Sequence, residues 1–350
     1  MKRAFLVLAL SLALGFLGLY LVAGGTLFEA ETYHLTDPSL GLAAVCVLAV
    51  VAQWGVPGIK LRLLCEGQGT VFPYRSTLVA HLVSVLGAAL TPSNTGGGPV
   101  AVVALGRLGM PSGKGLGVMV QVFVLDLVFF AWSAPLGLLY LVVWDVLSLS
   151  WRAEVLALAT VGLAAAAAGV LTRRPKLVAR GLLYLSTWPL LRGFDERLRN
   201  MARDYVGSAR AYRKTSAEYW MKLHVVTAVG WIAGFVVLWS LLGLYGVRTG
   251  FFTVLALLAS ITLISTFVPT PGGSGFIEAS VALAVGAGTG GVAAAVLLWR
   301  LLSFYLIFAL GPVAAWLLYT SPPATFPPKH PVCEKDPPPE PKKRPEPPSA

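Results

Sequence analysis

Eight long apolar runs, joined by segments that carry nearly all the charge, constrain this 350-residue chain more than any other feature. Several runs approach or exceed the roughly 20 residues that a helix needs to cross a bilayer. Hydrophobic residues make up 56% of the sequence and charged residues only 12%, which excludes an ordinary soluble globule. The sequence therefore predicts an all-α polytopic membrane protein. The runs are residues 4–24, 40–56, 77–90, 115–143, 155–171, 223–245, 251–268 and 292–319.

The placement of positive charge predicts which helix ends face the cytoplasm. Twelve Lys and Arg residues lie between residues 173 and 222, and Lys60, Arg62 and Arg75 mark another basic segment. Residues 25–37 hold three acidic residues and no Lys or Arg. Cytoplasmic loops of membrane proteins carry an excess of Lys and Arg. We therefore expect residues 25–37 outside and both termini in the cytoplasm. A cleaved signal peptide is a weaker interpretation of the first run, because its apolar length exceeds the usual core of about 7–15 residues.

Two Pro/Gly-rich breaks interrupt the apolar runs at matching places in the two halves of the chain. They read TPSNTGGGP at residues 91–99 and PTPGGSG at residues 269–275. The apolar piece after the first break is too short to cross a membrane as a helix. Each break therefore predicts a re-entrant hairpin made of a broken helix. Six full spans and two hairpins then form an inverted-topology repeat, which gives eight membrane segments in one transmembrane domain. The expected boundaries are 1–147 and 152–319 for the repeats and 1–319 for the domain.

Broken helices that meet inside a membrane are a common way to build a transporter binding site. Glycines allow a ligand to approach the backbone, and the free N–H groups at half-helix ends favour an anion such as a phosphate. We therefore predict a site for a phosphate-bearing lipid headgroup at the two hairpin tips. The competing interpretation is that Pro and Gly only kink packed helices. The predicted site residues are Thr91, Pro92, Asn94, Gly96, Gly97, Gly98, Thr270, Pro271, Gly272, Gly273, Ser274, Gly275 and Arg300.

Ionisable residues within the apolar runs are costly and often functional. Asp126 lies in the fourth run, and Arg300 lies in the last. Glu278 follows the second break by three residues, in the first turn of the expected half-helix, where a carboxylate favours the helix dipole. Glu278 and Arg300 are candidates for an ion pair, and Arg300 is also a candidate phosphate ligand. With Asp126 and His81, Glu278 is a candidate for coupling transport to an ion gradient, although a His in a membrane more often bonds between helices.

These motifs resemble the lysylphosphatidylglycerol synthase transmembrane, or flippase-like, family. The resemblance rests on the first break, on Asp126 in the following helix, and on the Pro-Gly-Gly block that leads to Glu278 and later Arg300. It covers about residues 4–319 and implies an integral protein of a prokaryotic cytoplasmic membrane. Relatives are implicated in moving lipids or lipid-linked sugars between leaflets. Many carry a Glu-Arg pair before the Asp, where this chain has Val122 and Phe123.

The resemblance implies a lipid translocase rather than an enzyme. Lysyl-lipid synthesis is not expected, since no aminoacyl-transferase domain follows residue 320. An intramembrane lipid-modifying enzyme and a non-transporting subunit of a lipid or glycan synthesis complex are the alternatives. Because no set of side chains has metal-ligand spacing, we expect no metal or other cofactor. Membrane lipids, anionic or phosphate-bearing, are the expected partners, together with lipid or glycan synthesis enzymes in the third interpretation.

Two polar segments lie outside the expected spans. Residues 173–222 show apolar residues at helical spacing opposite arginines, which is typical of amphipathic helices on an anionic cytoplasmic leaflet. Nucleic-acid binding is not expected, because these basic helices are tethered between membrane spans. Residues 320–350 hold 12 of the 24 prolines and predict a disordered cytoplasmic tail.

Overall fold

The structure is a computed structural model of the whole chain. It describes residues 2–23, 34–36, 39–91, 94–144, 162–163, 166, 169–170, 174–185, 195–286 and 291–320. The described part is helical, with no strand in these ranges. Its α-helices are α1 (Lys2–Ala23), α2 (Leu40–Glu66), α3 (Tyr74–Ala89), α4 (Gly97–Arg107), α5 (Ser112–Val143), α7 (Pro175–Leu185), α8 (Asp195–Tyr212), α9 (Ala217–Leu244), α10 (Phe251–Ser265), α11 (Phe276–Val285), α12 (Val292–Arg300) and α13 (Ile307–Thr320). A 3-10 turn, η5 (Pro271–Gly273), and a π-helical segment, η6 (Leu301–Tyr305), complete the order.

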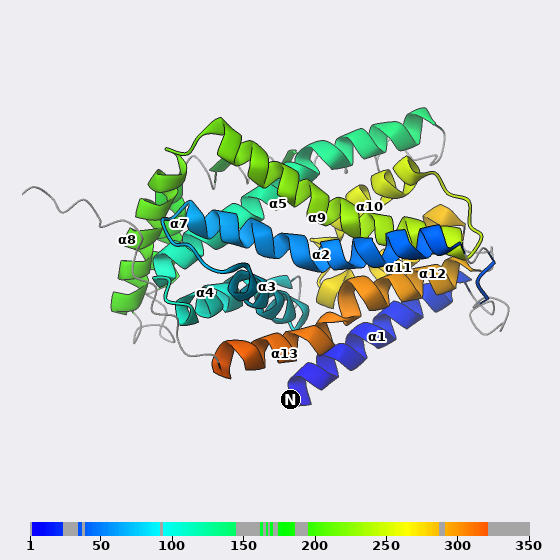
Figure 1. Cartoon of the computed structure of the whole chain (residues 1–350), viewed down its shortest axis with the longest axis horizontal. Helices are drawn as coiled ribbons and strands as arrows, with labels where there is room; N and C mark the ends of the chain where they lie inside the picture. The colour runs from blue at the N-terminus through cyan, green and yellow to red at the C-terminus, as the bar shows by residue number, and fades with distance from the viewer. Residues whose placement is uncertain are drawn as a thin grey trace, which may run out of the picture.

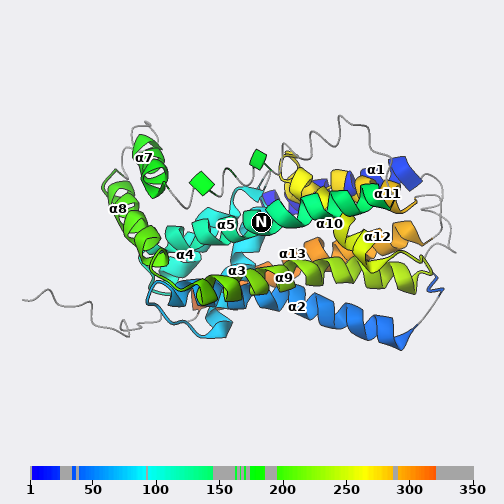
Figure 2. The same ribbon diagram turned by 90° about the horizontal axis from the view of Figure 1, so that it is seen from above.

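The long helices lie side by side along one direction, and α7 and α8 cross one end of the bundle (Figures 1 and 2). Among the described residues, four segments are long and apolar enough to span a membrane: Leu40–Glu66, Ser112–Val143, Ala217–Leu244 and Val292–Thr320. Shorter apolar helices cover Ala9–Val22 and Phe251–Ser265. The predicted all-α membrane protein is therefore confirmed. The span expected at 155–171 and the tail at 321–350 lie outside the described residues.

Both Pro/Gly breaks produce broken-helix hairpins. The first joins α3 to α4, and the two helices pack together so closely that a Cβ on Gly87 would lie 2.6 Å from Val100 Cγ2. The second joins α10 to α11 through η5, and α10 and α11 are also in contact. Two broken-helix hairpins are therefore present in the fold, and their re-entrant placement in the membrane stays a prediction. The inverted repeat that relates the two halves, with the boundaries given above, stays a prediction.

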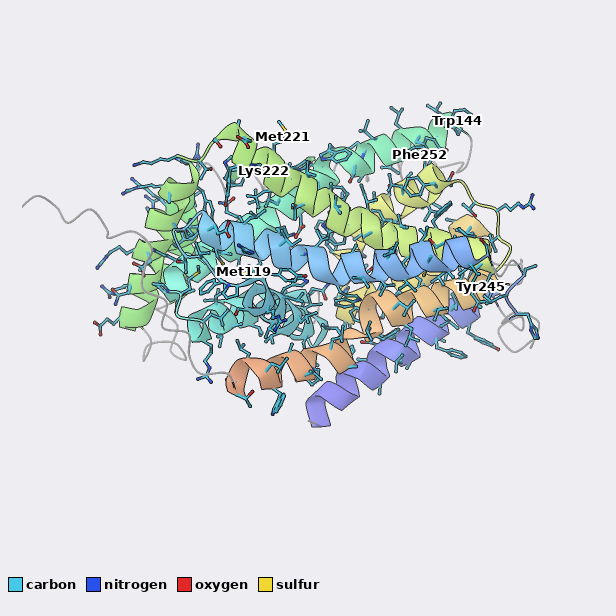
Figure 3. The ribbon with its side chains drawn as sticks, in the orientation of Figure 1. Met119, Trp144, Met221, Lys222, Tyr245 and Phe252 are labelled. Carbon is cyan, nitrogen blue, oxygen red and sulfur yellow. The ribbon has the colours of Figure 1, made fainter. Side chains whose placement is uncertain are left out.

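Aromatic side chains occur at both ends of the bundle, and Tyr212, Tyr219 and Trp220 cluster where α8 meets α9. Trp144, Tyr245 and Phe252 gather at one end, whereas Met221 and Lys222 lie at the other (Figure 3). Aromatic side chains are enriched at membrane–water interfaces because one part of the ring system is apolar and the other is wet. The end with Trp144, Tyr245 and Phe252 is the one that the charge pattern predicts to be outside.

Helix α8 packs on the bundle rather than lying free on it. Tyr205 and Tyr212 are buried, and the Tyr212 hydroxyl donates a 2.7 Å hydrogen bond to the carbonyl of Leu64 in α2. Burial raises the pKa of Tyr212 well above its usual value, so the hydroxyl remains a donor. The sequence predicted that this apolar face of α8 lies on the leaflet. That part of the prediction is wrong for α8, because Tyr205 and Tyr212 on this face are buried against α5 and α2 instead of facing lipid.

The contact between α8 and α5 depends on glycines that leave no room for a side chain. A Cβ on Gly113 would overlap Asp204 Cβ and lie 2.7 Å from the carbonyl oxygen of Met201. We predict that Gly113→Ala displaces α8 and lowers the free energy of unfolding by about 1–3 kcal/mol. Gly106→Ala on α4 is the matched control, because nothing lies within 4 Å of its Cβ position. Thermal unfolding in detergent measures both, and equal melting temperatures would contradict the prediction.

A second prediction concerns orientation. Thr36 bonds to the carbonyls of Leu244 and Tyr245, so residues 34–36 sit at the end opposite the α13 terminus (Figure 1). The third cysteine, Cys333, lies outside the described residues and is first replaced by Ser to remove its thiol. In that background, Leu35→Cys should react with a membrane-impermeant maleimide from outside the cell, and Tyr319→Cys should react only from inside. Both positions are exposed, whereas Cys46 and Cys65 are buried. If Leu35→Cys is labelled only from the cytoplasm, the predicted orientation is wrong.

Candidate functional site

The second hairpin tip is an irregular turn that only glycine permits. Gly272, Gly273 and Gly275 have φ values of 61°, 67° and 88°, which residues with a Cβ rarely adopt. Helix α11 begins directly afterwards, and Glu278 occupies its third position. The Glu278 carboxylate accepts a 2.8 Å hydrogen bond from the backbone N–H of Gly275. This carboxylate therefore satisfies a donor that the break leaves unpaired at the start of the half-helix.

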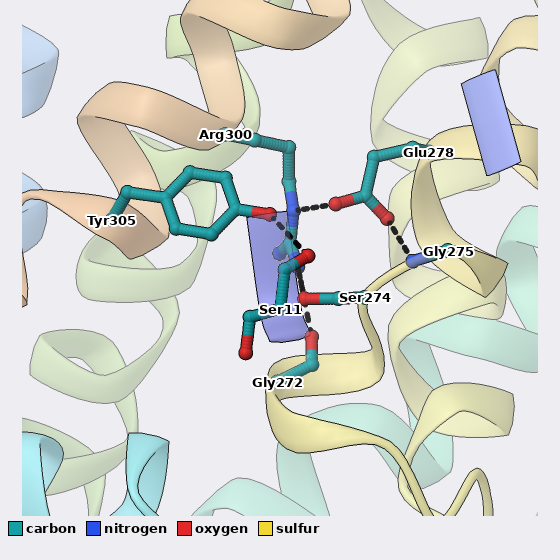
Figure 4. A network of polar contacts seen from close by, with 7 residues as sticks. All are labelled: Ser11, Gly272, Ser274, Gly275, Glu278, Arg300 and Tyr305. Atoms are coloured by element: carbon teal, nitrogen blue, oxygen red, sulfur yellow. Dashed lines mark hydrogen bonds and ion pairs between the residues drawn. The ribbon is translucent and has the colours of Figure 1, made fainter. Parts of the chain in front are cut away.

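Arg300, the last residue of α12, joins both sides of this break (Figure 4). Its Nε donates to Glu278 Oε1 at 2.7 Å, and its Nη2 donates to the Gly272 carbonyl at 3.0 Å and to Ser274 Oγ at 3.3 Å. The side chains of Arg300 and Glu278 are only 5% and 1% exposed. The expected ion pair therefore exists. Because Nε and Nη2 of Arg300 already donate to groups of the protein, the guanidinium stabilises the second tip in this conformation.

The π-helical segment η6 follows Arg300 directly and ties the site to α2. In a π-helix each backbone hydrogen bond spans five residues instead of four, as in the bond from Leu306 N–H to the Leu301 carbonyl. The Leu302 carbonyl accepts bonds from Trp54 Nε1 at 2.9 Å and Gln53 Nε2 at 3.4 Å. Such bulges recur at functional sites. Here η6 places Arg300 and Tyr305 on the same side of the second tip (Figure 4).

Helix α1 covers the second tip through a face of small residues. A Cβ on Gly15 would lie 2.9 Å from Glu278 Oε1, and one on Gly18 would overlap the Gly275 backbone. Tyr305 donates a 3.0 Å bond to the Ser11 carbonyl. A cavity of about 180 Å³ remains between α1 and the Arg300–Glu278 pair. Ser11, Gly15 and Gly18 lie four and three residues apart, a small-residue pattern that is typical of close helix packing and from which the covering role of α1 could have been predicted.

The first hairpin tip uses a hydroxyl where the second uses an ion pair. Thr91 Oγ1 accepts a 2.7 Å bond from the Gly96 N–H and so closes the turn into α4. Gly96 and Gly97 allow the close approach of α3, since Cβ atoms there would contact Gly87 and Ala88. Gly98, by contrast, faces open space. Asn94 is exposed with a φ of 57°, and Pro92 lies outside the described residues.

The two hairpins meet, because α3 contacts η5. Several of the predicted tip residues close a turn or allow a neighbouring helix to pack closely. These are Thr91, Gly96, Gly97, Gly272 and Gly275. In contrast, Thr270 Oγ1 is buried without a hydrogen-bond partner among the described residues. Within the part of the chain that the structure describes, there is space beside Gly98 on the first tip and a cavity beside Arg300 on the second.

Asp126 belongs to a different charged group from Glu278 and Arg300. Lys60 Nζ lies 2.8 Å from Asp126 Oδ1, and Trp231 Nε1 donates to the same oxygen at 2.8 Å. His81 on α3 is within electrostatic reach of Lys60. The sequence places Lys60 in a basic segment on the cytoplasmic side and predicts no partner for Asp126. In the structure α2 continues to Glu66, so Lys60 lies within this helix and pairs with Asp126.

A bundle of apolar helices with two broken-helix hairpins defines a polytopic integral membrane protein. The sequence profile of the lysylphosphatidylglycerol synthase TM region matches residues 4–311, and the chain belongs to that family. No curated protein matches the chain in sequence. Membership of this family indicates a membrane protein that acts on lipids.

The buried ion pair generates a stability prediction. Glu278→Gln should lower the free energy of unfolding by about 3–5 kcal/mol, because it leaves the Arg300 charge buried and unpaired. Adding Arg300→Met should recover part of that loss, since no isolated charge remains. Unfolding in dodecyl sulfate–detergent mixtures measures the double-mutant cycle.

The exposed pair of Glu218 and Lys222 on α9, with nitrogen and oxygen 2.7 Å apart, is the matched control. Glu218→Gln should leave the unfolding midpoint unchanged, because exposed pairs contribute little. If Glu278→Gln and Glu218→Gln unfold alike, the pair does not stabilise the second tip.

Proposed function

We propose that this protein is a lipid translocase rather than an enzyme, and that it moves a phosphate-bearing lipid or lipid-linked glycan between leaflets. The observation that carries the proposal is the contact between α3 of the first hairpin and η5 at the second tip, beside the buried Arg300–Glu278 pair. Irregular backbone within a membrane is tolerated only where protein buries it or where it lines a wet cavity. Maintaining two such breaks and an ion pair there is costly, which supports a transport role.

The first tip supplies the surface for initial contact with the headgroup. Helix α4 begins at Gly97, and its first N–H groups point toward its N-terminal end. The open space at Gly98 lets a headgroup approach the backbone, and the positive end of the helix dipole favours a phosphate. Thr91 and Ser84 hold this turn in place through bonds to Gly96 and Gly97.

The second tip is closed in this conformation. Its cavity of about 180 Å³ is smaller than the roughly 300–1,000 Å³ of typical ligand pockets. Helix α1 and the η6 residue Tyr305 close it. In the proposed cycle, separation of α1 from α11 opens this cavity and exposes the Arg300 guanidinium to the headgroup. The acyl chains remain in the bilayer throughout.

The driving force in this proposal is either the lipid gradient or an ion gradient. Glu278 and Asp126 are the carboxylates that an ion or proton would reach within the bundle. Each has a basic partner, Arg300 and Lys60 respectively. Protonation of either carboxylate would therefore release its partner and change the contacts between helices.

Reconstitution into vesicles with headgroup-labelled phospholipids tests the proposal. Leaflet exchange, followed by chemical quenching of the outer label, should slow at least about tenfold in the Glu278→Gln, Arg300→Gln double variant. A tenfold effect corresponds to about 1.4 kcal/mol in the barrier. The Glu218→Gln, Lys222→Gln variant loses an exposed pair of the same charges and should exchange lipids at the wild-type rate. Equal exchange in wild type and both variants would overturn the mechanism.

A further inference from the structure

The ion pair of Lys60 and Asp126 lies within the bundle and takes no part in closing either hairpin tip. Lys60 Nζ lies 2.8 Å from Asp126 Oδ1, and Trp231 Nε1 donates to the same oxygen at 2.8 Å. The group therefore joins three long helices, α2, α5 and α9. Asp126 lies near the middle of α5, far from both of its ends. Ionisable residues at such depth are costly and commonly mark ion pathways or proton relays.

The two oxygens of the Asp126 carboxylate have different surroundings. Both hydrogen bonds fall on Oδ1, and Oδ2 has no partner among the described residues. The side chain is 25% exposed, and Oδ2 is not enclosed. An ionised carboxylate can accept bonds on both oxygens. Oδ2 is therefore free to take up a proton.

The Glu278 carboxylate offers no such free oxygen. Its Oε1 accepts from Arg300, and its Oε2 accepts from the Gly275 N–H. The side chain is only 1% exposed. A proton on Glu278 would weaken contacts that hold the second tip together. Of these two carboxylates, Asp126 is the one that can exchange a proton while the tip stays intact.

The groups around Asp126 favour a proton over a metal ion. Lys60 and Trp231 are hydrogen-bond donors, whereas a metal ion needs several lone-pair ligands. Within the described part of the chain, no three His, Cys, Asp or Glu side chains are grouped so that they could hold a metal. The Lys60 ammonium also repels any second cation at this carboxylate. A proton needs only one lone pair, and it removes the negative charge that holds Lys60.

The other charged groups on helices that pack against α5 lie away from Asp126. Helix α10 carries no ionisable side chain. On α4 and α8, Arg107 and Asp204 lie near the start of α5, about 20 Å from Asp126 along the helix. Arg213, after α8, lies beside Val124, which is about 200° around α5 from Asp126 and so on the opposite face.

The remaining titratable groups on α2, α3 and α9 leave Lys60 as the closest charge. His224 accepts a 2.8 Å bond from Trp132 and not from Asp126. His81 on α3 is within electrostatic reach of Lys60. Two further pairs on these helices bind each other: Arg62 with Glu66 on α2, and Glu218 with Lys222 on α9. The charge of Asp126 is therefore balanced chiefly by Lys60.

We propose that Asp126 is a proton-binding site that couples translocation to the proton gradient across the membrane. A proton from the outer side binds Oδ2 and converts the carboxylate into a carboxylic acid, and the same proton later leaves to the cytoplasm. Loss of the negative charge releases the Lys60 ammonium, which extends along α2 toward its cytoplasmic end at Glu66. The inference rests on the proposed translocation function and deepens it, because it names the ion and the carboxylate that drive the cycle.

Helix α2 links this event to the second tip. Trp54 of α2 donates a 2.9 Å bond to the Leu302 carbonyl in η6. It lies six residues, or about 9 Å, from Lys60 along the helix. While Lys60 is bonded to Asp126, α2 is held against α5. Release of Lys60 lets α2 and η6 shift together relative to α5, and η6 in turn holds α1 through Tyr305.

Infrared difference spectroscopy of the full chain in lipid membranes tests the proton site without any transport. On acidification, the wild type should gain the high-frequency C=O stretch of a carboxylic acid shielded from water. Asp126→Asn should lack this band. Because Asn leaves the Lys60 ammonium unpaired, the Lys60→Met, Asp126→Asn variant is measured as well and should also lack it. Identical spectra in the wild type and the double variant would overturn the proposal.

Glu66→Gln is the matched control. It also removes one carboxylate from an ion pair, with nitrogen and oxygen 2.9 Å apart, and the Glu66 side chain is 31% exposed against 25% for Asp126. This variant should keep the shielded band. If Glu66→Gln loses it as Asp126→Asn does, the band does not belong to Asp126 and the assignment is wrong.

Leaflet exchange of headgroup-labelled phospholipids in vesicles with an imposed pH gradient tests the coupling. The wild type and Glu66→Gln should exchange lipids several-fold faster with the gradient than without it. The Lys60→Met, Asp126→Asn variant should exchange at one rate under both conditions. A sodium gradient at equal pH should have no effect, and acceleration by sodium alone would contradict a proton as the coupling ion.

These measurements separate the two proposals. Wild-type exchange that ignores the pH gradient refutes the coupling and leaves translocation standing. No exchange in the wild type under any condition refutes the proposed function, and the infrared band then still decides whether Asp126 binds a proton.

Discussion

The buried pair of Arg300 and Glu278 is the interaction on which the second half of the structure depends. A membrane interior supplies no water, so every backbone group freed by a broken helix needs a partner within the protein. Glu278 accepts from Gly275 on one side of the break, and Arg300 donates to the Gly272 carbonyl and Ser274 on the other. The two charges also neutralise each other. The contacts of α1 and η6 with the second tip rest on this arrangement.

The two hairpins satisfy the same constraint with different chemistry. The first uses the Thr91 hydroxyl and closely packed glycines, which leaves Gly98 beside open space. The second uses an ion pair and is covered by α1. A second ion pair within the bundle, Lys60 and Asp126, lies apart from both tips and joins α2 to α5. This asymmetry favours a cycle in which the first tip is accessible in the present conformation and the second becomes accessible only when α1 moves.

Much of the candidate site follows from spacing alone. The Pro/Gly breaks predicted both hairpins, and the position of Glu278 three residues after Gly275 predicted its role at the start of α11. The contact between Lys60 and Asp126 was missed because the sequence does not show that α2 continues past the apolar run as far as Glu66. The covering role of α1 was available in the pattern of Ser11, Gly15 and Gly18 but needs a known neighbour to be interpreted.

The sequence by itself determined the membrane class, the helical content and the two breaks, because these depend on composition and local spacing. The tertiary structure alone decided which groups satisfy one another and which tip is covered by α1. Glu278 and Arg300 are 22 residues apart, and Lys60 and Asp126 are 66 apart. Sequence separation carries no distance information across helices. Contacts of this kind depend on how the helices pack, and packing is a property of the whole bundle.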